Sequence, residues 1–402
     1  MTLFEKSQSI LLNISLFSAL KANCAEETFL GPLRLKSLKL NYCLSGTIAE
    51  FDFLSRNNNN ISSVFKKGTP VFVCHEEGAE IISECYFISL INGNISVLIT
   101  DDKFRYLNLH SNYIIIPGLL HDALENLESL IKKREWEGMP GERILHFMHR
   151  SLEMPFPHLY SKPLKSVINE NLNKEQKNAV GAALDDKFPL VAICGPPGTG
   201  KTHVVEEIIQ QAIKLGKRIL VCAASNLAVE NIYNRLKDKS VVYLHSLNAS
   251  LSENSLSENL YLYKKSEHMN TISKKQVIFC TLTSKLIHSF STSGFKPDLT
   301  IIDEVAQAME CVTYPALLQA PRVVLVGDQN QLCAILRSPE AEKGGLGQSI
   351  LEFLMKEFGK SFVLSLNIQY RMNEKIMRWW SSAQFYGSNL VAHATVAKQT
   401  LR

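Results

Sequence analysis

The feature that most constrains the fold is a glycine-rich stretch between an apolar run and a helical pattern. The run Leu190–Cys194 predicts a buried strand, and the residues after the stretch have helical periodicity. Eight residues between them fit the pattern G-x-x-x-x-G-K-[ST]: Gly195, Pro196, Pro197, Gly198, Thr199, Gly200, Lys201 and Thr202. This context predicts a phosphate-binding loop in an α/β fold, rather than a glycine-rich turn without a ligand.

Each residue type in this loop suits a nucleoside triphosphate. Glycines let the backbone wrap the phosphates with its N–H groups, and the N-terminus of the following helix adds positive potential. We expect Lys201 to reach the β and γ phosphates and the Thr202 hydroxyl to bind Mg²⁺. The loop therefore predicts a bound nucleotide and a magnesium ion.

Apolar runs rich in Val and Ile alternate with helical stretches from Leu172 onward. The runs cover residues 190–194, 218–223, 276–280, 299–302, 323–326 and 362–366. Because they lack polar alternation, we expect strands covered on both faces, in a parallel sheet wrapped by helices. The sequence Asp303-Glu304 follows one such run, where Asp303 would hold the metal and Glu304 would take a proton from the attacking water.

The first third of the chain has a different pattern. Short alternating strands at 33–40, 71–73, 86–90 and 95–99, with Asn92-Gly93 as a hairpin turn, predict a small OB-like β-barrel over residues 30–118. Amphipathic helical patterns in residues 1–29 and at Leu120, Leu124, Leu127 and Ile131 predict a two-helix stalk. Residues 119–171 would hold the second stalk helix and a linker.

Composition adds weaker constraints. With 46% hydrophobic and 20% charged residues, the 402-residue chain is expected to be globular, and its net charge of +4 suits an anionic partner without demanding one. The nine cysteines never form C-x-x-C, which favours buried thiols over disulfides or zinc. No run is long enough to span a bilayer, so we expect no membrane association, and a location in cytoplasm or nucleus.

Six blocks occur in the order typical of one motor family. They begin at Gln176 and continue at residues 220–231, 277–284, 303–308, 326–332 and 369–372. In these blocks the chain resembles superfamily 1 helicases of the up-frameshift-like group, which move 5′ to 3′ along nucleic acid. The resemblance implies a P-loop NTPase, RecA-like first domain at 172–360 with a variable insertion at 246–275. It places the start of a second domain at 361–402.

The resemblance also implies roles for single residues. ATP would be the nucleotide, with Gln176 reading its adenine and Tyr370 stacking on that base. Gln331 would sense the γ-phosphate, and Arg371 would stabilise charge on the transferred phosphoryl group, so that Lys201, Glu304, Gln331 and Arg371 form the catalytic set. The alternatives without a functional role are that Gln331 is an ordinary amide in a loop and that Tyr370 is an aromatic residue of the core.

Single-stranded RNA or DNA is the partner that the resemblance implies, and the sequence does not decide between them. Candidate contacts are Ser225, Asn226, Thr281, Thr283 and Ser284. Each of these residue types also caps helices routinely. Strand binding of this kind is expected to follow the backbone and to weaken with salt.

The chain departs from the family pattern at His203, Ala224 and Cys333-Ala334, where coupling of hydrolysis to strand movement is in doubt. The last two motifs of the family have no counterpart before Arg402. We therefore expect the 402-residue chain to bind ATP, hydrolyse it slowly and not unwind duplexes. Three interpretations stay open: a helicase that works as a monomer, a module that binds nucleic acid or a ribosomal or ribonucleoprotein partner, and another P-loop ATPase.

Overall fold

The computed structural model describes most of the barrel and of the α/β part of the chain. The described residues are 30–41, 46–54, 70–76, 81–91, 93–99, 102–117, 134–150, 152–157, 164, 166–236, 241–245, 255–257, 272–284, 287, 290–334, 342–381 and 385–400. The expected stalk helices and most of the expected insertion at 246–275 lie outside them. The chain divides into two compact units, and each is taken by itself.

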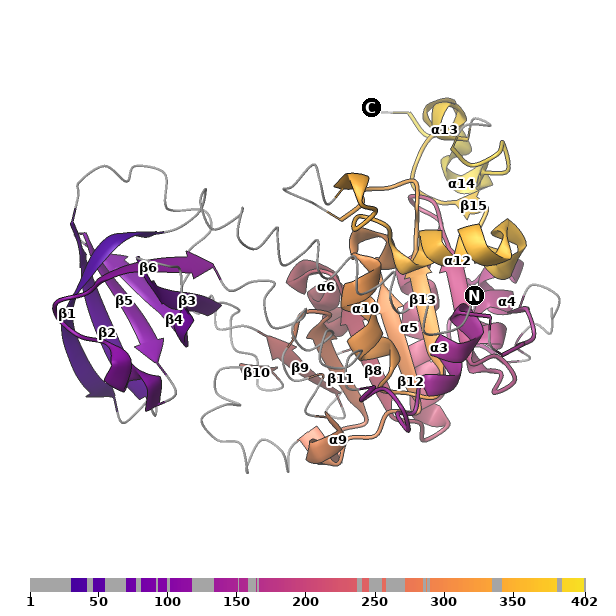
Figure 1. Cartoon of the computed structure of the whole chain (residues 1–402). Helices are drawn as coiled ribbons and strands as arrows, with labels where there is room; N and C mark the ends of the chain where they lie inside the picture. The colour runs from indigo at the N-terminus through magenta and orange to yellow at the C-terminus, as the bar shows by residue number, and fades with distance from the viewer. Residues whose placement is uncertain are drawn as a thin grey trace. The chain divides into compact units, whose positions relative to one another are not determined.

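One unit contains the predicted barrel, which is closed in the strand order β1-β2-β5-β4-β3-β6 (Figure 1). Its strands are β1 (Leu30–Asn41), β2 (Gly46–Phe53), β3 (Pro70–His75), β4 (Ile81–Ile91), β5 (Asn94–Ile99) and β6 (Asn112–Pro117). Every paired neighbour is antiparallel, and alternate side chains such as Phe51, Val97 and Tyr113 fill the interior. The predicted hairpin joins β4 to β5, with Gly93 at φ +81°.

The other unit is built on an eight-stranded sheet in the order β10-β9-β11-β8-β12-β13-β7-β14. The strands are β7 (Leu190–Cys194), β8 (Ile219–Ala223), β9 (Val241–His245), β10 (Ser255–Ser257), β11 (Val277–Thr281), β12 (Leu299–Asp303), β13 (Val323–Gly327) and β14 (Val363–Ser365). Neighbours from β9 to β14 pair in parallel. The expected parallel sheet and its six apolar runs are confirmed, whereas β9 and β10 were not predicted.

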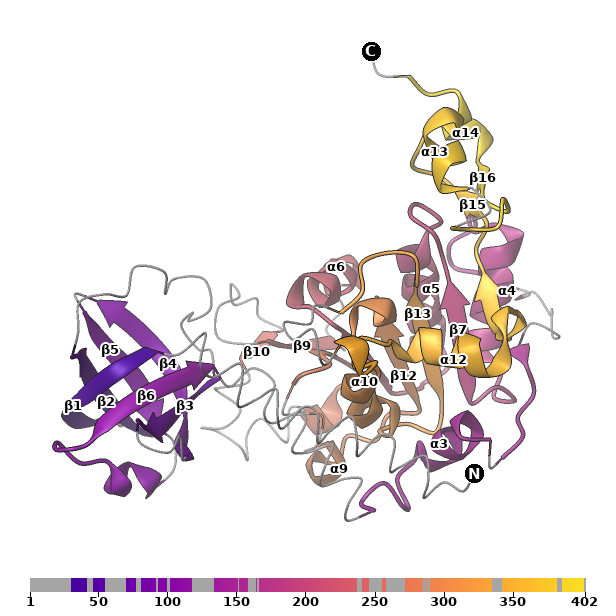
Figure 2. The ribbon, with the colours of Figure 1, turned by 45° about the horizontal axis from the view of Figure 1, so that its top comes forward.

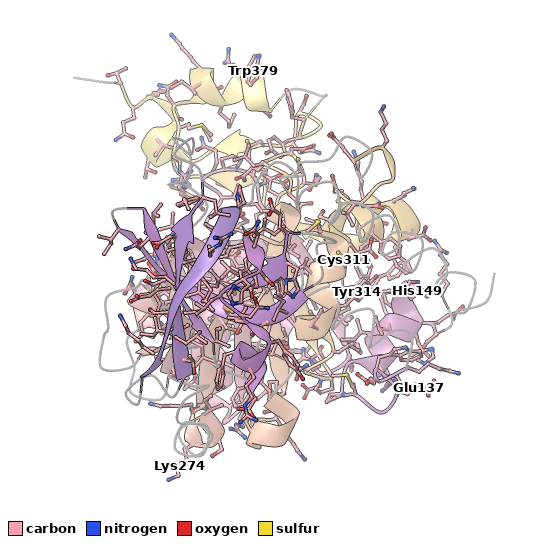
Figure 3. All side chains as sticks on the ribbon, turned by 60° about the vertical axis from the view of Figure 1, so that its left-hand side comes forward. Glu137, His149, Lys274, Cys311, Tyr314 and Trp379 are labelled. Atoms are coloured by element: carbon pink, nitrogen blue, oxygen red, sulfur yellow. The ribbon has the colours of Figure 1, made fainter. Side chains whose placement is uncertain are left out.

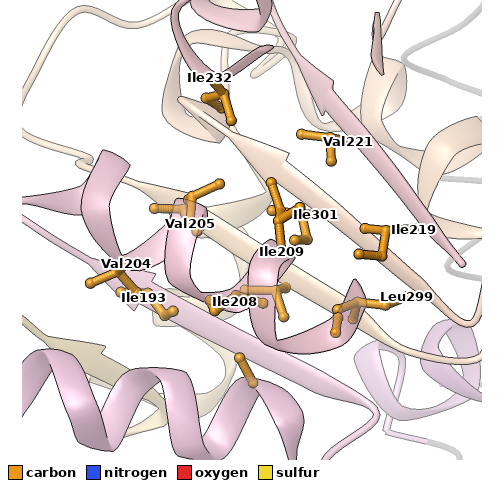
Figure 4. Packing of buried hydrophobic residues seen from close by; sticks show 14 of the residues in the cluster. Ile193, Val204, Val205, Ile208, Ile209, Ile219, Val221, Ile232, Leu299 and Ile301 are labelled. Carbon is orange, nitrogen blue, oxygen red and sulfur yellow. The ribbon is translucent and has the colours of Figure 1, made fainter. Parts of the chain in front are cut away.

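Helices cover both faces of this sheet. On one face α4 (Lys174–Leu184), α5 (Lys201–Lys214) and α6 (Asn226–Leu236) pack on alternate strand residues, and Figure 4 shows Ile208 and Ile209 of α5 among strand side chains. Burying one such side chain contributes about 1.5–3 kcal/mol. On the other face lies α10 (Glu310–Leu317), where the Thr300 hydroxyl donates to the Ala316 carbonyl.

Further helices belong to the same unit. They are α3 (Glu142–Met148), α9 (Phe290–Ser293), α12 (Ile350–Phe358), α13 (Glu374–Trp380) and α14 (Ala394–Ala397). Five of the described cysteines are buried, as expected: Cys74, Cys85, Cys194, Cys222 and Cys280. Within the described part of the chain, no helix has the length and apolar character needed to cross a membrane.

Two observations bear on the expected domain bounds. Residues 119–171 were expected to hold a stalk helix and a linker; within them the Gly141 N–H donates to the Leu318 carbonyl and Phe147 stacks on Phe358, so residues 134–150 pack on the α/β unit. A second domain was expected to begin at residue 361, but β14 is the edge strand beside β7. The first sheet therefore extends to Ser365.

After β14 the chain forms a small group of elements that Figure 2 shows together. Strands β15 (Ile368–Gln369) and β16 (Val391–Ala392) pair in parallel, with α13 and α14 beside them. This group contains the predicted block at 369–372, which therefore lies close to the end of the eight-stranded sheet.

Candidate nucleotide-binding site

The glycine-rich loop joins β7 to α5 at the carboxyl edge of the sheet, as predicted. Gly200, at φ +83°, turns the chain into the helix, a conformation that favours glycine. The buried Thr199 hydroxyl donates to the Pro196 carbonyl (2.7 Å), and Lys201 Nζ donates to the Gly195 carbonyl (2.8 Å). The Lys201 ammonium group therefore lies within the loop where the phosphates are expected to bind.

The Gln176 amide connects the loop to the start of α4, because its two ends bond different partners. Its Nε2 donates to the Thr199 carbonyl (2.9 Å), and its Oε1 accepts the Asn173 N–H (2.9 Å) in a capping box at the start of α4. The side chain is only 3% exposed. Gln176 is thus in direct contact with the phosphate loop, and its role in reading adenine stays a prediction.

Asp303 ends β12 and Glu304 follows it, on the same edge of the sheet. Asp303 is 4% exposed, and its Oδ1 has no hydrogen-bond partner among the described residues. Burial, with the neighbouring Glu304 as a second cause, raises the pKa of Asp303 to about 7. A buried carboxylate oxygen left without a donor is costly, and a divalent cation is the ligand that such an oxygen prefers.

Glu304 has a backbone conformation that is rare for its residue type. It lies in the left-handed region at φ +48°, at the start of a 3₁₀ turn over Val305–Gln307. Such strain costs about 1–3 kcal/mol and concentrates at functional sites. Among the described residues, the partly exposed carboxylate accepts one long bond, from Gln307 (3.5 Å), which leaves it available to a water molecule.

The turn after β13 holds the predicted γ-phosphate sensor. Gln331 Nε2 donates to Asp328 Oδ2 (2.6 Å), and Asp328 is fully buried. The Cys194 thiol, whose pKa burial raises to about 12, donates to Gln329 Oε1 (3.0 Å). This thiol directly precedes the phosphate loop, so the start of the loop is anchored beside the turn after β13.

Tyr370 and Arg371 lie against the phosphate loop. The Tyr370 N–H donates to the Gly198 carbonyl (2.8 Å), and a Cβ built on Gly198 would lie 2.6 Å from Arg371 Cβ. The Tyr370 hydroxyl accepts a hydrogen bond from Asn173 Nδ2 (3.0 Å), and its ring lies 4.6 Å from that of His393. The Tyr370 ring therefore already contacts another side chain, that of His393.

The strand-binding candidates lie in two adjacent loops, because Ala223 and Thr281 end neighbouring strands in register. The candidates Asn226 and Thr283 are exposed, and Thr281 is partly exposed. Ser225 is exposed and accepts the Ala228 N–H, as a helix cap would. Ser284 is buried, so it lies beneath this surface.

Several contacts in the site involve residues that the sequence reasoning missed. Glu175 accepts the Asn367 N–H (2.7 Å), and Tyr386 donates to Asp328 (2.7 Å). The pattern Asn173-x-x-Gln176 before an apolar run is a capping-box signal that predicts the start of α4. No local pattern predicts the contact of Tyr386, which lies 58 residues from its partner.

Comparison with protein families gives two matches, both to models described as an AAA domain. One covers residues 171–255 and 244–339, and the other covers residues 346–402. Together they span the phosphate loop, Asp303 and the turn after β13, and the segment that contains Tyr370.

Comparison with curated proteins gives relatives that carry helicase or DNA-binding names. The chain is 31% identical to mouse (Mus musculus) DNA-binding protein SMUBP-2 over 68% of its own length and 33% of that protein. It is 34% identical to DNA polymerase alpha-associated DNA helicase A of Schizosaccharomyces pombe (58% and 42%) and 30% identical to ATP-dependent helicase NAM7 of Saccharomyces cerevisiae (70% and 32%). The chain thus spans less than half of each of these relatives.

Proposed function

Because the chain belongs to the up-frameshift-like group of superfamily 1 helicases, we propose that it binds ATP·Mg²⁺ and one nucleic-acid strand as part of an ATP-driven 5′ to 3′ helicase. The observation that carries the proposal is the buried Asp303 Oδ1, which has no hydrogen-bond donor within the described part of the chain. Asp303 ends β12, at the carboxyl edge of the sheet where the phosphate loop follows β7.

The residues divide the work as follows. Thr202 and Asp303 would hold the metal ion, which when bound neutralises charge on phosphate oxygens. Lys201 exchanges its bond to the Gly195 carbonyl for the β and γ phosphates. Glu304 accepts a proton from water, and Arg371 stabilises negative charge on the phosphoryl group.

Strand binding is assigned to the exposed edge beside β8 and β11. The hydroxyl and amide groups of Ser225, Asn226, Thr281 and Thr283 offer hydrogen bonds to a sugar-phosphate backbone, without reading bases. Binding should then depend weakly on sequence and fall as salt rises. RNA and DNA both meet this description.

The test measures ATP turnover and the binding of a fluorescent single-stranded oligonucleotide, by the 402-residue chain and two variants. Lys201→Ala should lose ATP binding, whereas Glu304→Gln should bind ATP with normal affinity and lose turnover. Equal turnover in wild type and Glu304→Gln would contradict the assignment of the base. Binding of both ligands without any turnover would favour a binding module over an enzyme.

A further inference from the structure

Asp328 is a buried carboxylate on which two parts of the chain converge. Its Oδ2 accepts hydrogen bonds from both Gln331 Nε2 (2.6 Å) and the Tyr386 hydroxyl (2.7 Å). Its Oδ1 accepts the Asn330 N–H (3.1 Å). Gln331 belongs to the turn after β13, whereas Tyr386 belongs to the segment between α13 and β16, so one oxygen atom joins the two.

A second hydrogen bond fixes the same pair of segments. Asn330 Nδ2 donates to the Phe385 carbonyl (2.7 Å), directly beside Tyr386. The Phe385 ring in turn lies 5.5 Å from that of Trp379, which is labelled on α13 in Figure 3. Because two bonds act on adjacent residues, the position of Tyr386 is set by the turn that carries Gln331.

The Tyr386 hydroxyl stays protonated at neutral pH and can therefore act as a donor. Burial and the hydrogen bond to Asp328 raise the pKa of its hydroxyl above its ordinary value of 10.0. Asp328 is fully buried, so losing all donors to its Oδ2 would leave a buried carboxyl oxygen unsatisfied.

We propose that Tyr386 is a positioning residue for Gln331, the donor that keeps Asp328 satisfied when the glutamine turns to the γ-phosphate. This rests on the proposed function, in which Gln331 contacts the γ-phosphate. In the structure the Gln331 amide is held by Asp328, and on this proposal its turn toward the γ-phosphate exchanges that hydrogen bond for one to ATP. Tyr386 keeps its own bond to the same oxygen, which makes the release of Gln331 inexpensive.

The proposal predicts a specific defect in Tyr386→Phe. Without the hydroxyl, release of Gln331 strips Oδ2 of its donors, so binding of a γ-phosphate becomes less favourable. Affinity for the ATP analogue AMP-PNP with Mg²⁺ should fall about tenfold, while affinity for ADP with Mg²⁺ stays within about twofold. A merely structural defect would instead weaken both nucleotides equally.

The experiment is calorimetry of AMP-PNP and ADP on the 402-residue chain and its Tyr386→Phe, Gln331→Ala and double variants. The ratio of the two affinities should fall in each single variant, and the double variant should match Gln331→Ala. Tyr314→Phe is the matched control, because its buried hydroxyl also donates to a carboxylate, that of Glu310. Tyr314 lies on α10, away from Trp379 in Figure 3, so its ratio should equal that of wild type.

The outcomes separate the two levels of the account. If wild type ignores both nucleotides, the proposed function fails. If wild type binds them but Tyr386→Phe keeps the wild-type ratio, or the two substitutions lower the ratio additively, the role of Tyr386 is overturned while nucleotide binding stands. Thermal unfolding of each variant verifies that the protein is folded.

Discussion

Gly198 allows a direct test of the contact between the phosphate loop and the segment that carries Arg371. Gly198 has φ +80°, and an added Cβ would lie 2.6 Å from Arg371 Cβ. Gly216, just after α5, has φ +71° with nothing within 4 Å of an added Cβ. Comparing Gly198→Ala with Gly216→Ala therefore separates the cost of the contact from the cost of the backbone conformation.

The magnitudes follow from these geometries. A left-handed φ costs a non-glycine residue about 1–2 kcal/mol, which applies to both variants. Carbon atoms normally approach to about 3.5–4.0 Å, so Arg371 must move by about 1 Å in Gly198→Ala alone. That movement breaks the Tyr370 N–H bond to the Gly198 carbonyl, worth about 1 kcal/mol. Gly198→Ala should thus lose about 1–3 kcal/mol more than Gly216→Ala.

The assay is urea unfolding of both variants, with ATP·Mg²⁺ affinity as a second measurement. Only Gly198→Ala should weaken nucleotide binding, because Gly216 lies at the far end of α5 from the phosphate loop. Equal losses of unfolding free energy, together with unchanged ATP affinity, would refute the packing of Arg371 on the loop.

Three further predictions concern titration and capping. Burial raises the pKa of Glu310 to about 7 from 4.5, so the folded state keeps a proton that the unfolded chain releases. The free energy of unfolding should therefore fall as pH rises from 4.5 to 7. Urea titrations at pH 5 and pH 7.5 should show a smaller difference for Glu310→Gln than for wild type. Because burial raises the pKa of Asp303 to about 7, Mg²⁺ must displace a proton from it below that pH. The apparent affinity of the chain for Mg²⁺ should then fall by up to about tenfold per pH unit. Calorimetry in buffers of different ionisation enthalpy should detect the released proton. Asn173→Ala and Ser349→Ala each remove the N-cap of a capping box, so each should lower the free energy of unfolding in urea by about 1 kcal/mol. Only Asn173→Ala should also weaken ATP binding, because Asn173 donates a hydrogen bond to the Tyr370 hydroxyl.

The sequence predicts the sheet well because its strands are short, unbroken apolar runs. Strand β7 matches its predicted run, and β12 differs from the expected 299–302 by one residue. Strand β9 is equally apolar, but it leads into the Ser-, Asn- and Lys-rich stretch at 246–275, whose composition predicts a surface insertion. The closed barrel follows from period-two alternation, which fixes the inward face of each strand.

The site was predicted at the level of residue type and less well at the level of contacts. A motif gives the position of Gln176 but not the groups that its amide faces, and here those groups are Asn173 and Thr199. No local sequence pattern predicts the left-handed backbone of Glu304, because glutamate rarely adopts this conformation. Tyr386 was missed because tertiary packing alone brings it to Asp328.

The central claim is that Lys201, Thr202 and Asp303 form a site for ATP·Mg²⁺. Calorimetric titration of the folded 402-residue chain tests it, with Lys201→Ala as the comparison. The account predicts saturable heat at submillimolar ATP·Mg²⁺ in wild type and its loss in Lys201→Ala. A folded wild-type chain that releases no binding heat at millimolar ATP·Mg²⁺ would contradict it.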